Sequence, residues 1–136
     1  MTVKDTQAMI AGMTPTLNPG TWAFCAVNGN GTIPKDAFAI IQEAEGTTLI
    51  LPKPTAQAGG YTSGPAMKKI TLQVNSDLEG VGLTAAVATA LTKQSIPCNV
   101  VAGYHHDHIF VPEAQAGLAH ATLLQLQGDA TPVSSD

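Results

Sequence analysis

The chain has 136 residues, a hydrophobic fraction of 44% and an aromatic fraction of 4%, which suits one ordinary domain or two small ones with an aliphatic core. Six lysines, no arginine and ten acidic residues give a net charge of −4. A nucleic-acid surface needs clustered positive charge, and only Lys68 and Lys69 are adjacent, so we expect no nucleic-acid partner. Without arginine, an anionic ligand would have to be held by backbone N–H groups, hydroxyls or lysine.

The N-terminal residues do not have the pattern of a signal peptide, because Lys4 and Asp5 precede only a short apolar run. No segment has the length and hydropathy of a membrane span. Cys25 and Cys98 lie far apart in two predicted strands, and we expect both to be buried free thiols. These features predict a cytoplasmic protein with no membrane partner.

The first half of the chain is predicted to alternate helix and strand. Its elements are, in order, a short helix Thr6–Ala11, a strand Trp22–Val27, a helix Pro34–Ala44, a strand Thr47–Leu51, and a loop or irregular hairpin Pro52–Pro65. Pro34 suits the first turn of the second helix, and Ala37, Phe38 and Ile41 would form its buried stripe before Gly46 ends it.

The second half repeats the order of strand, loop, helix and strand. Its elements are a strand Ile70–Val74, a glycine loop, a helix from Leu83 to about Gln94, strands Asn99–Gly103 and Ile109–Val111 around a turn Tyr104–His108, and a helix Glu113–Gln127 with Gly128 past its end. Strand–helix–strand used twice, with an added hairpin and helix, predicts ferredoxin-like α+β layers with helices on one face of antiparallel sheets. A single doubly wound sheet is the alternative; the short hairpin Asn99–Val111 argues against it.

The glycine loop is the main candidate site. Gly80–Ala85 has the spacing of the dinucleotide fingerprint, but Asn75–Glu79 separates it from its strand, which weakens that interpretation. The glycines could instead serve only to let helix and strand pack closely. We favour a third interpretation, in which unpaired N–H groups at the start of the helix bind a small anion such as an α-carboxylate.

The histidine cluster Tyr104–His108 is the only group suited to metal binding or acid–base chemistry. His106 and His108 could share a strand face, with a third ligand from Asp107, Glu113 or His120. A polar hairpin tip is the simpler interpretation. Neither cysteine has a histidine near it in sequence, and no pair of carboxylates suggests catalysis, so we predict no catalytic residue, no resident metal and no cofactor.

The stretch Leu78–Pro112 resembles ACT domains, above all those of small bacterial proteins with two tandem ACT-like units, relatives of the aspartokinase regulatory domain and of cytosolic arginine sensors. It has the glycine-containing turn, the following helix, a strand start at Ile96–Val100 and the ending His106–Pro112. Leu17–Val27 is similar to the start of the first unit in that group. The resemblance divides the chain into a first unit 1–66, a second unit 67–128 and a flexible tail 129–136.

The resemblance implies allosteric binding of an amino acid rather than catalysis. It points to a ligand-binding set on the loop and on the strand opposite: Asn75, Ser76, Asp77, Leu78, Gly80, Val81, Gly82, Leu83, Cys98, Asn99 and Val100. Asp77, or Asn99 through its amide oxygen, could accept from the ammonium group. The first unit's loop Asn28–Pro34 does not resemble a ligand loop, which suggests that only the second unit binds.

The leading hypothesis is therefore an amino-acid-binding regulatory protein that forms a homodimer through exposed sheet edges or helix faces. The alternative from another class is a metal-dependent or thiol enzyme that uses the cluster His105–His108. A third possibility is a structural interaction module in which the glycine loop only packs.

Overall fold

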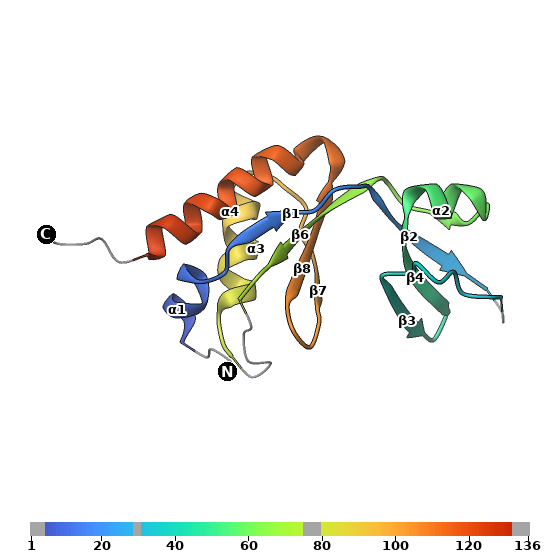
Figure 1. Cartoon of the computed structure of the whole chain (residues 1–136), viewed down its shortest axis with the longest axis horizontal. Helices are drawn as coiled ribbons and strands as arrows, with labels where there is room; N and C mark the ends of the chain where they lie inside the picture. The colour runs from blue at the N-terminus through green and yellow to red at the C-terminus, as the bar shows by residue number, and fades with distance from the viewer. Residues whose placement is uncertain (1–4, 29–30, 75–79, 132–136) are drawn as a thin grey trace, which may run out of the picture. The chain divides into compact units, whose positions relative to one another are not determined.

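The computed structural model describes residues 5–28, 31–74 and 80–131 (Figure 1). Contacts divide the chain into two compact units. The terminal unit combines Met1–Asn18 with Lys69–Asp136, and the inserted unit is Pro19–Lys68. By their contacts, residues 1–18 thus belong with the second half of the chain. The predicted boundary between residues 66 and 67 instead divides the chain by its sequence repeat, and it stays a prediction.

The sheet of the terminal unit has the order β1-β6-β8-β7. Its strands are β1 (Pro15–Leu17), β6 (Met67–Leu72), β7 (Asn99–Ala102) and β8 (Asp107–Pro112). β1 pairs antiparallel with β6, with Pro15 opposite Leu72, and β7 pairs antiparallel with β8, with Asn99 opposite Phe110. The predicted strands of this half exist, but β6 begins three residues before Ile70, and β1 is a strand that the sequence analysis did not predict.

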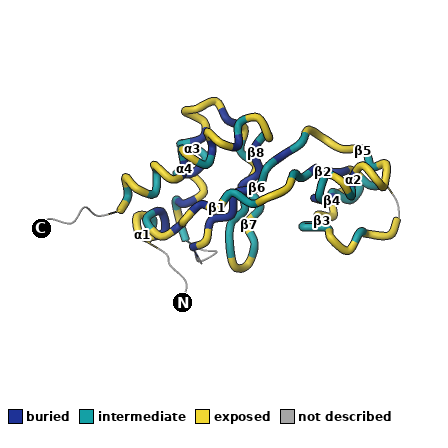
Figure 2. The backbone as a smooth tube through the Cα atoms, turned by 45° about the horizontal axis from the view of Figure 1, so that its top comes forward, coloured by how far each residue is buried: buried dark blue, intermediate teal, exposed yellow. Residues whose placement is uncertain are grey.

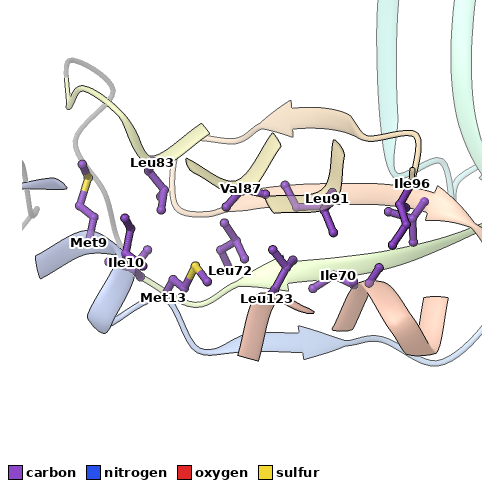
Figure 3. Close-up of a cluster of buried hydrophobic side chains, with 14 of the residues drawn as sticks. Met9, Ile10, Met13, Ile70, Leu72, Leu83, Val87, Leu91, Ile96 and Leu123 are labelled. Carbon is purple, nitrogen blue, oxygen red and sulfur yellow. The ribbon is translucent and has the colours of Figure 1, made fainter. Parts of the chain in front are cut away.

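Helices cover one face of this sheet. They are α1 (Thr6–Ala11), α3 (Leu83–Lys93) and α4 (Ala116–Ala130), the last preceded by a 3₁₀ turn, Glu113–Gln115. Their buried side chains form one cluster with those of β6 and β8, including Met9, Leu83 and Leu123 (Figure 3). In Figure 2, dark blue segments of the tube mark buried residues of β6 and β8. Gly128 was expected beyond the last helix but lies inside α4, which ends at Ala130 with Thr131 as its C-cap residue.

The strands of the inserted unit pair in the order β3-β4-β2-β5. Its elements are β2 (Trp22–Val27), β3 (Ala39–Glu43), β4 (Gly46–Pro52), α2 (Lys53–Ala58) and β5 (Thr62–Ser63). Its core cluster is small: Ala23, Cys25, Leu49, Leu51 and Ala56. β2 has the predicted bounds, and β4 extends the predicted strand by one residue at each end.

The predicted helix Pro34–Ala44 is wrong, because residues 39–43 form β3. Ala39 pairs with Ile50 and Glu43 with Gly46, so β3 and β4 make a hairpin around Ala44 and Glu45. β4 supplies the hydrogen-bond partners of this strand, and the adjacent β-branched residues Ile40 and Ile41 favour the extended conformation. Gly46 has φ +147°, and a Cβ there would lie 2.9 Å from the carbonyl oxygen of Val27, so this glycine allows a close approach and does not end a helix.

The expected loop Pro52–Pro65 contains α2 and the two-residue strand β5. Pro52 caps α2, and Pro54 occupies its first turn, where a missing N–H costs little. The prolines that suggested a loop therefore begin a helix. Ala56 of this helix is buried against β2 and β4.

The ferredoxin-like α+β class with antiparallel pairing is confirmed, and the antiparallel β7–β8 pair excludes the doubly wound alternative for the terminal unit. Within the described part of the chain, no helix has both the length and the hydropathy needed to cross a bilayer.

Candidate functional site

The glycine turn leads directly into α3. Gly82 is the N-cap residue of α3 with φ +103° and ψ −18°, and no side chain of the cap residue bonds to the first turn. Val81 is 77% exposed, whereas Leu83 is buried in the core. Glycine is the residue that takes this positive φ without strain. Of the predicted loop residues, Asn75, Ser76, Asp77 and Leu78 lie outside the described residues.

The N-terminal helix reaches this turn. The Thr6 hydroxyl donates a hydrogen bond to the carbonyl of Val81. A Cβ built on Gly82 would lie 2.8 Å from Cγ2 and 3.0 Å from Oγ1 of Thr6. Met9 and Ile10 of the same helix are buried in the core cluster that contains Leu83 (Figure 3). Gly82 therefore has two reasons to be glycine, its φ and the closeness of Thr6.

The hairpin tip between β7 and β8 lies close to Val74, which follows β6. Nδ1 of His106 is 3.5 Å from the carbonyl oxygen of Val74, and the N–H of Gly103 donates to the carbonyl of His106 at 2.9 Å. Tyr104 at this tip is 81% exposed. Thr6 thus contacts the turn, and His106 contacts Val74, two residues past the end of β6.

The predicted residues on the opposite strand lie at the other end of α3. Ile96 follows α3 and donates its N–H to the carbonyl of Leu91, so the chain turns at the C-terminal end of that helix. Eleven helical residues span about 16 Å. Figure 3 shows Leu83 and Ile96 at opposite ends of the cluster. Within this unit the structure therefore does not bring the turn together with Cys98, which precedes β7, or with Asn99 and Val100 of β7.

These three residues make contacts elsewhere in the unit. Cys98 and Val100 pack against the helix-covered core, and Asn99 Nδ2 is 3.5 Å from the carbonyl oxygen of Phe110. Cys25 is buried as expected, whereas Cys98 is only partly buried, and burial raises the pKa of both thiols above the usual range for cysteine. A thiol whose pKa is raised is a poor nucleophile, so a thiol enzyme gains no support.

His108 and His120 contact different parts of the unit. Nδ1 of His108 lies 3.0 Å from Oγ1 of Thr71, and the same Thr71 oxygen accepts a hydrogen bond from Asn18 Nδ2 at 2.8 Å. Nε2 of His120 lies 2.9 Å from the carbonyl oxygen of Pro15. In the described residues, no three His, Cys, Asp or Glu side chains lie close enough to hold a metal ion. The described residues therefore provide no ligand set for the metal-dependent enzyme considered as the alternative.

Burial shifts the pKa values of two titratable side chains in β8, Asp107 and His108. Burial, and then the positive charges of Lys69 and His106, lower the pKa of His108 below 6.5. Burial raises the pKa of Asp107, and the charge of His106 opposes this effect. The lowered pKa favours the neutral form of His108, in which an unprotonated Nδ1 can accept from the Thr71 hydroxyl.

Sequence reasoning did not find Thr6 as a neighbour of the turn. The two are 75 positions apart, and Thr6 lies in a helix that was assigned to the other half of the chain. A polar residue in the first turn of a short helix carries no local signal for such a contact.

Two ACT-domain family models match the chain, one over residues 2–67 and the other over residues 63–125. No curated protein sequence matches it significantly. The crystal structure of a Vibrio cholerae protein of unknown function, described as a possible transport protein, shares 40% identity over 89% of this chain and 94% of its own, with a TM-score of 0.78.

Two more distant structures share the fold. An Agrobacterium tumefaciens protein has 16% identity over 85% of this chain and 89% of its own, with a TM-score of 0.70. The ligand-free regulatory subunit of aspartate kinase from Thermus thermophilus has 12% identity over 85% of this chain and 97% of its own, with a TM-score of 0.63. The expected resemblance is confirmed: this chain belongs to the ACT-domain family and carries two ACT domains in tandem.

Proposed function

We propose that this protein is a cytoplasmic regulatory protein that binds an amino acid, or a similar small zwitterion, at the turn Val81–Leu83 and catalyses no reaction itself. The observation that carries the proposal is the backbone-only cap of α3. Gly82 provides no side chain that could bond to the first turn of the helix, so a carboxylate could take the place of a capping side chain at these N–H groups. ACT domains typically bind small regulatory molecules, which supports the same choice of ligand.

The chemistry of the turn suits a weakly charged ligand better than a phosphate. The chain has no arginine, so attraction comes from N–H groups and the positive end of α3, typically about 0.3–1 kcal/mol for the helix dipole. The ammonium partner proposed from the sequence, Asp77, lies outside the described residues. Asn99, the other candidate, is at the far end of α3, and we therefore centre the proposal on the turn.

Calorimetric titration against the twenty amino acids tests this proposal. We expect one of them to bind at millimolar concentration or below and to raise the melting temperature. Val81→Glu places a negative charge on the exposed side of the turn and should weaken binding about three- to tenfold through repulsion of the carboxylate. Leu124→Glu, at a 45% exposed position on α4, is the matched control and should leave affinity unchanged.

Absence of binding and of any thermal shift across the panel would refute the proposed function. Equal weakening by the two glutamate variants would instead show a general charge effect and remove the turn as the site.

We also propose that the protein is a homodimer that pairs through a sheet edge. β3 is the last strand in the order of the inserted unit's sheet, and Ile40 and Ile41 on it are 48% and 42% exposed. Natural edge strands are commonly protected by charge or proline, and these two positions carry neither. Size-exclusion chromatography with light scattering should give twice the chain mass, and Ile40→Lys should give a monomer. A monomeric parent protein at micromolar concentration would contradict the dimer.

A further inference from the structure

We propose that Thr6 is a positioning residue of the turn: its hydroxyl fixes the peptide group between Val81 and Gly82 so that the Gly82 N–H faces away from α1. The inference rests on the proposed function and assigns a role to the N-terminal helix in the same site. The observation behind it is a single contact, the hydrogen bond from Thr6 Oγ1 to the carbonyl oxygen of Val81.

The geometry of the peptide unit carries the argument. A trans peptide is planar, and its C=O and N–H point in opposite directions. Because the Val81 carbonyl points at Thr6, the N–H of Gly82 in the same plane points to the opposite side of the turn. A peptide group next to a glycine could otherwise rotate at little steric cost. The Thr6 hydroxyl removes that freedom and keeps the Gly82 N–H on the side of the turn where a carboxylate would bind.

Thr6 can do this because α1 is anchored along its length. Asp5 caps its start by accepting from the N–H of Ala8 at 2.8 Å. Met9 and Ile10 are 1% and 4% exposed in the core. At its end, Gln127 of α4 donates from Nε2 to the carbonyl of Ala11 at 2.8 Å.

This arrangement makes binding and helix docking reciprocal. A ligand that needs the Gly82 N–H in this orientation binds more tightly when α1 is docked, and by linkage its binding holds α1 more firmly in place. α1 thereby couples the turn to the N-terminal end of the chain. We expect slower amide hydrogen exchange in α1, measured at Met9 and Ile10, when the amino acid found by titration is bound.

Two substitutions separate the hydroxyl from the shape of the side chain. Thr6→Val keeps the branched shape and removes the donor, whereas Thr6→Ser keeps the donor and removes the methyl group. A typical hydrogen bond corresponds to about a three- to tenfold change in an equilibrium constant. We therefore expect Thr6→Val to bind the amino acid about three- to tenfold more weakly, and Thr6→Ser to stay within about twofold of the parent protein.

A second measurement needs no ligand. The carbonyl carbon-13 shift of Val81 and the amide nitrogen-15 shift of Gly82 should change in Thr6→Val and return toward the parent values in Thr6→Ser. A purely structural role for the side chain would instead follow its volume, and Thr6→Val would resemble the parent. If Thr6→Val does not fold, Thr6→Ala, which favours helix, replaces it.

Unchanged shifts in Thr6→Val, or unchanged affinity, would overturn the inference. If no amino acid binds the parent protein, the proposed function fails on its own, and the two shifts still decide whether Thr6 positions the peptide.

Discussion

The glycine at the start of α3 offers the sharpest test of the terminal unit. Gly82→Ala must place a side chain at φ +103° and put its Cβ 2.8 Å from Cγ2 of Thr6. The left-handed conformation costs an ordinary residue about 1–2 kcal/mol, and overpacking costs about 1–3 kcal/mol. We therefore expect Gly82→Ala to lower the free energy of unfolding by about 2–5 kcal/mol.

Two matched variants separate these costs. Gly60 has φ +65° and no heavy atom within 4 Å of a built Cβ, so Gly60→Ala should cost only the conformational term, about 1–2 kcal/mol. Thr6→Ala introduced with Gly82→Ala removes the atoms that clash, and the double mutant should recover much of the difference. Urea denaturation followed by far-UV circular dichroism measures all four proteins. A Gly82→Ala cost no larger than that of Gly60→Ala, or no recovery in the double mutant, would refute the contact as described.

Three further predictions concern the terminal unit. Gly117 and Gly128 lie inside α4 with nothing within 4 Å of a built Cβ, so changing either to alanine should raise stability by about 0.5–1 kcal/mol in the same urea assay. Because the pKa of His108 is lowered in the folded protein, the unfolded chain binds its proton at higher pH, and stability should fall as the pH drops below 6.5. His108→Asn should lose less stability than the parent between pH 7 and pH 5, measured by thermal melts. A chain that begins at residue 19 lacks α1 and β1 and should lose the cooperative unfolding of the terminal unit, and a synthetic peptide of residues 1–18 should restore it.

Local patterns were enough to predict most of the terminal unit. The α3 stripe of Leu83, Val87 and Leu91 has helical spacing, and all three are buried. The β7–β8 hairpin followed from two extended runs around a short polar turn. In each case the residues that determine the element lie within the element itself, which is why the sequence pattern sufficed.

The inserted unit was harder because its elements depend on partners elsewhere in the chain. Residues 34–44 have helical spacing of apolar side chains, yet Ile40 and Ile41 are exposed on an edge strand that exists only because β4 pairs with it. Neither the β1–β6 pairing nor the contact of Thr6 with Val81 has a local signal, since each joins residues more than fifty positions apart. The predicted site was therefore incomplete on the side formed by α1.

The N-terminal segment, residues 5–18, packs with the second ACT domain although the sequence repeat places it in the first. Asn18 donates from its backbone N–H to the carbonyl of Lys69 at 2.9 Å, and its side chain reaches Thr71. The segment is thus held at both ends, by Thr6 at the turn and by Asn18 at β6. The family match over residues 63–125 contains the turn but not the segment. A fragment that begins at residue 67 would contain the turn but not the Thr6 hydroxyl that orients the peptide group between Val81 and Gly82. Weak binding by such a fragment would therefore be no evidence against the turn as a site.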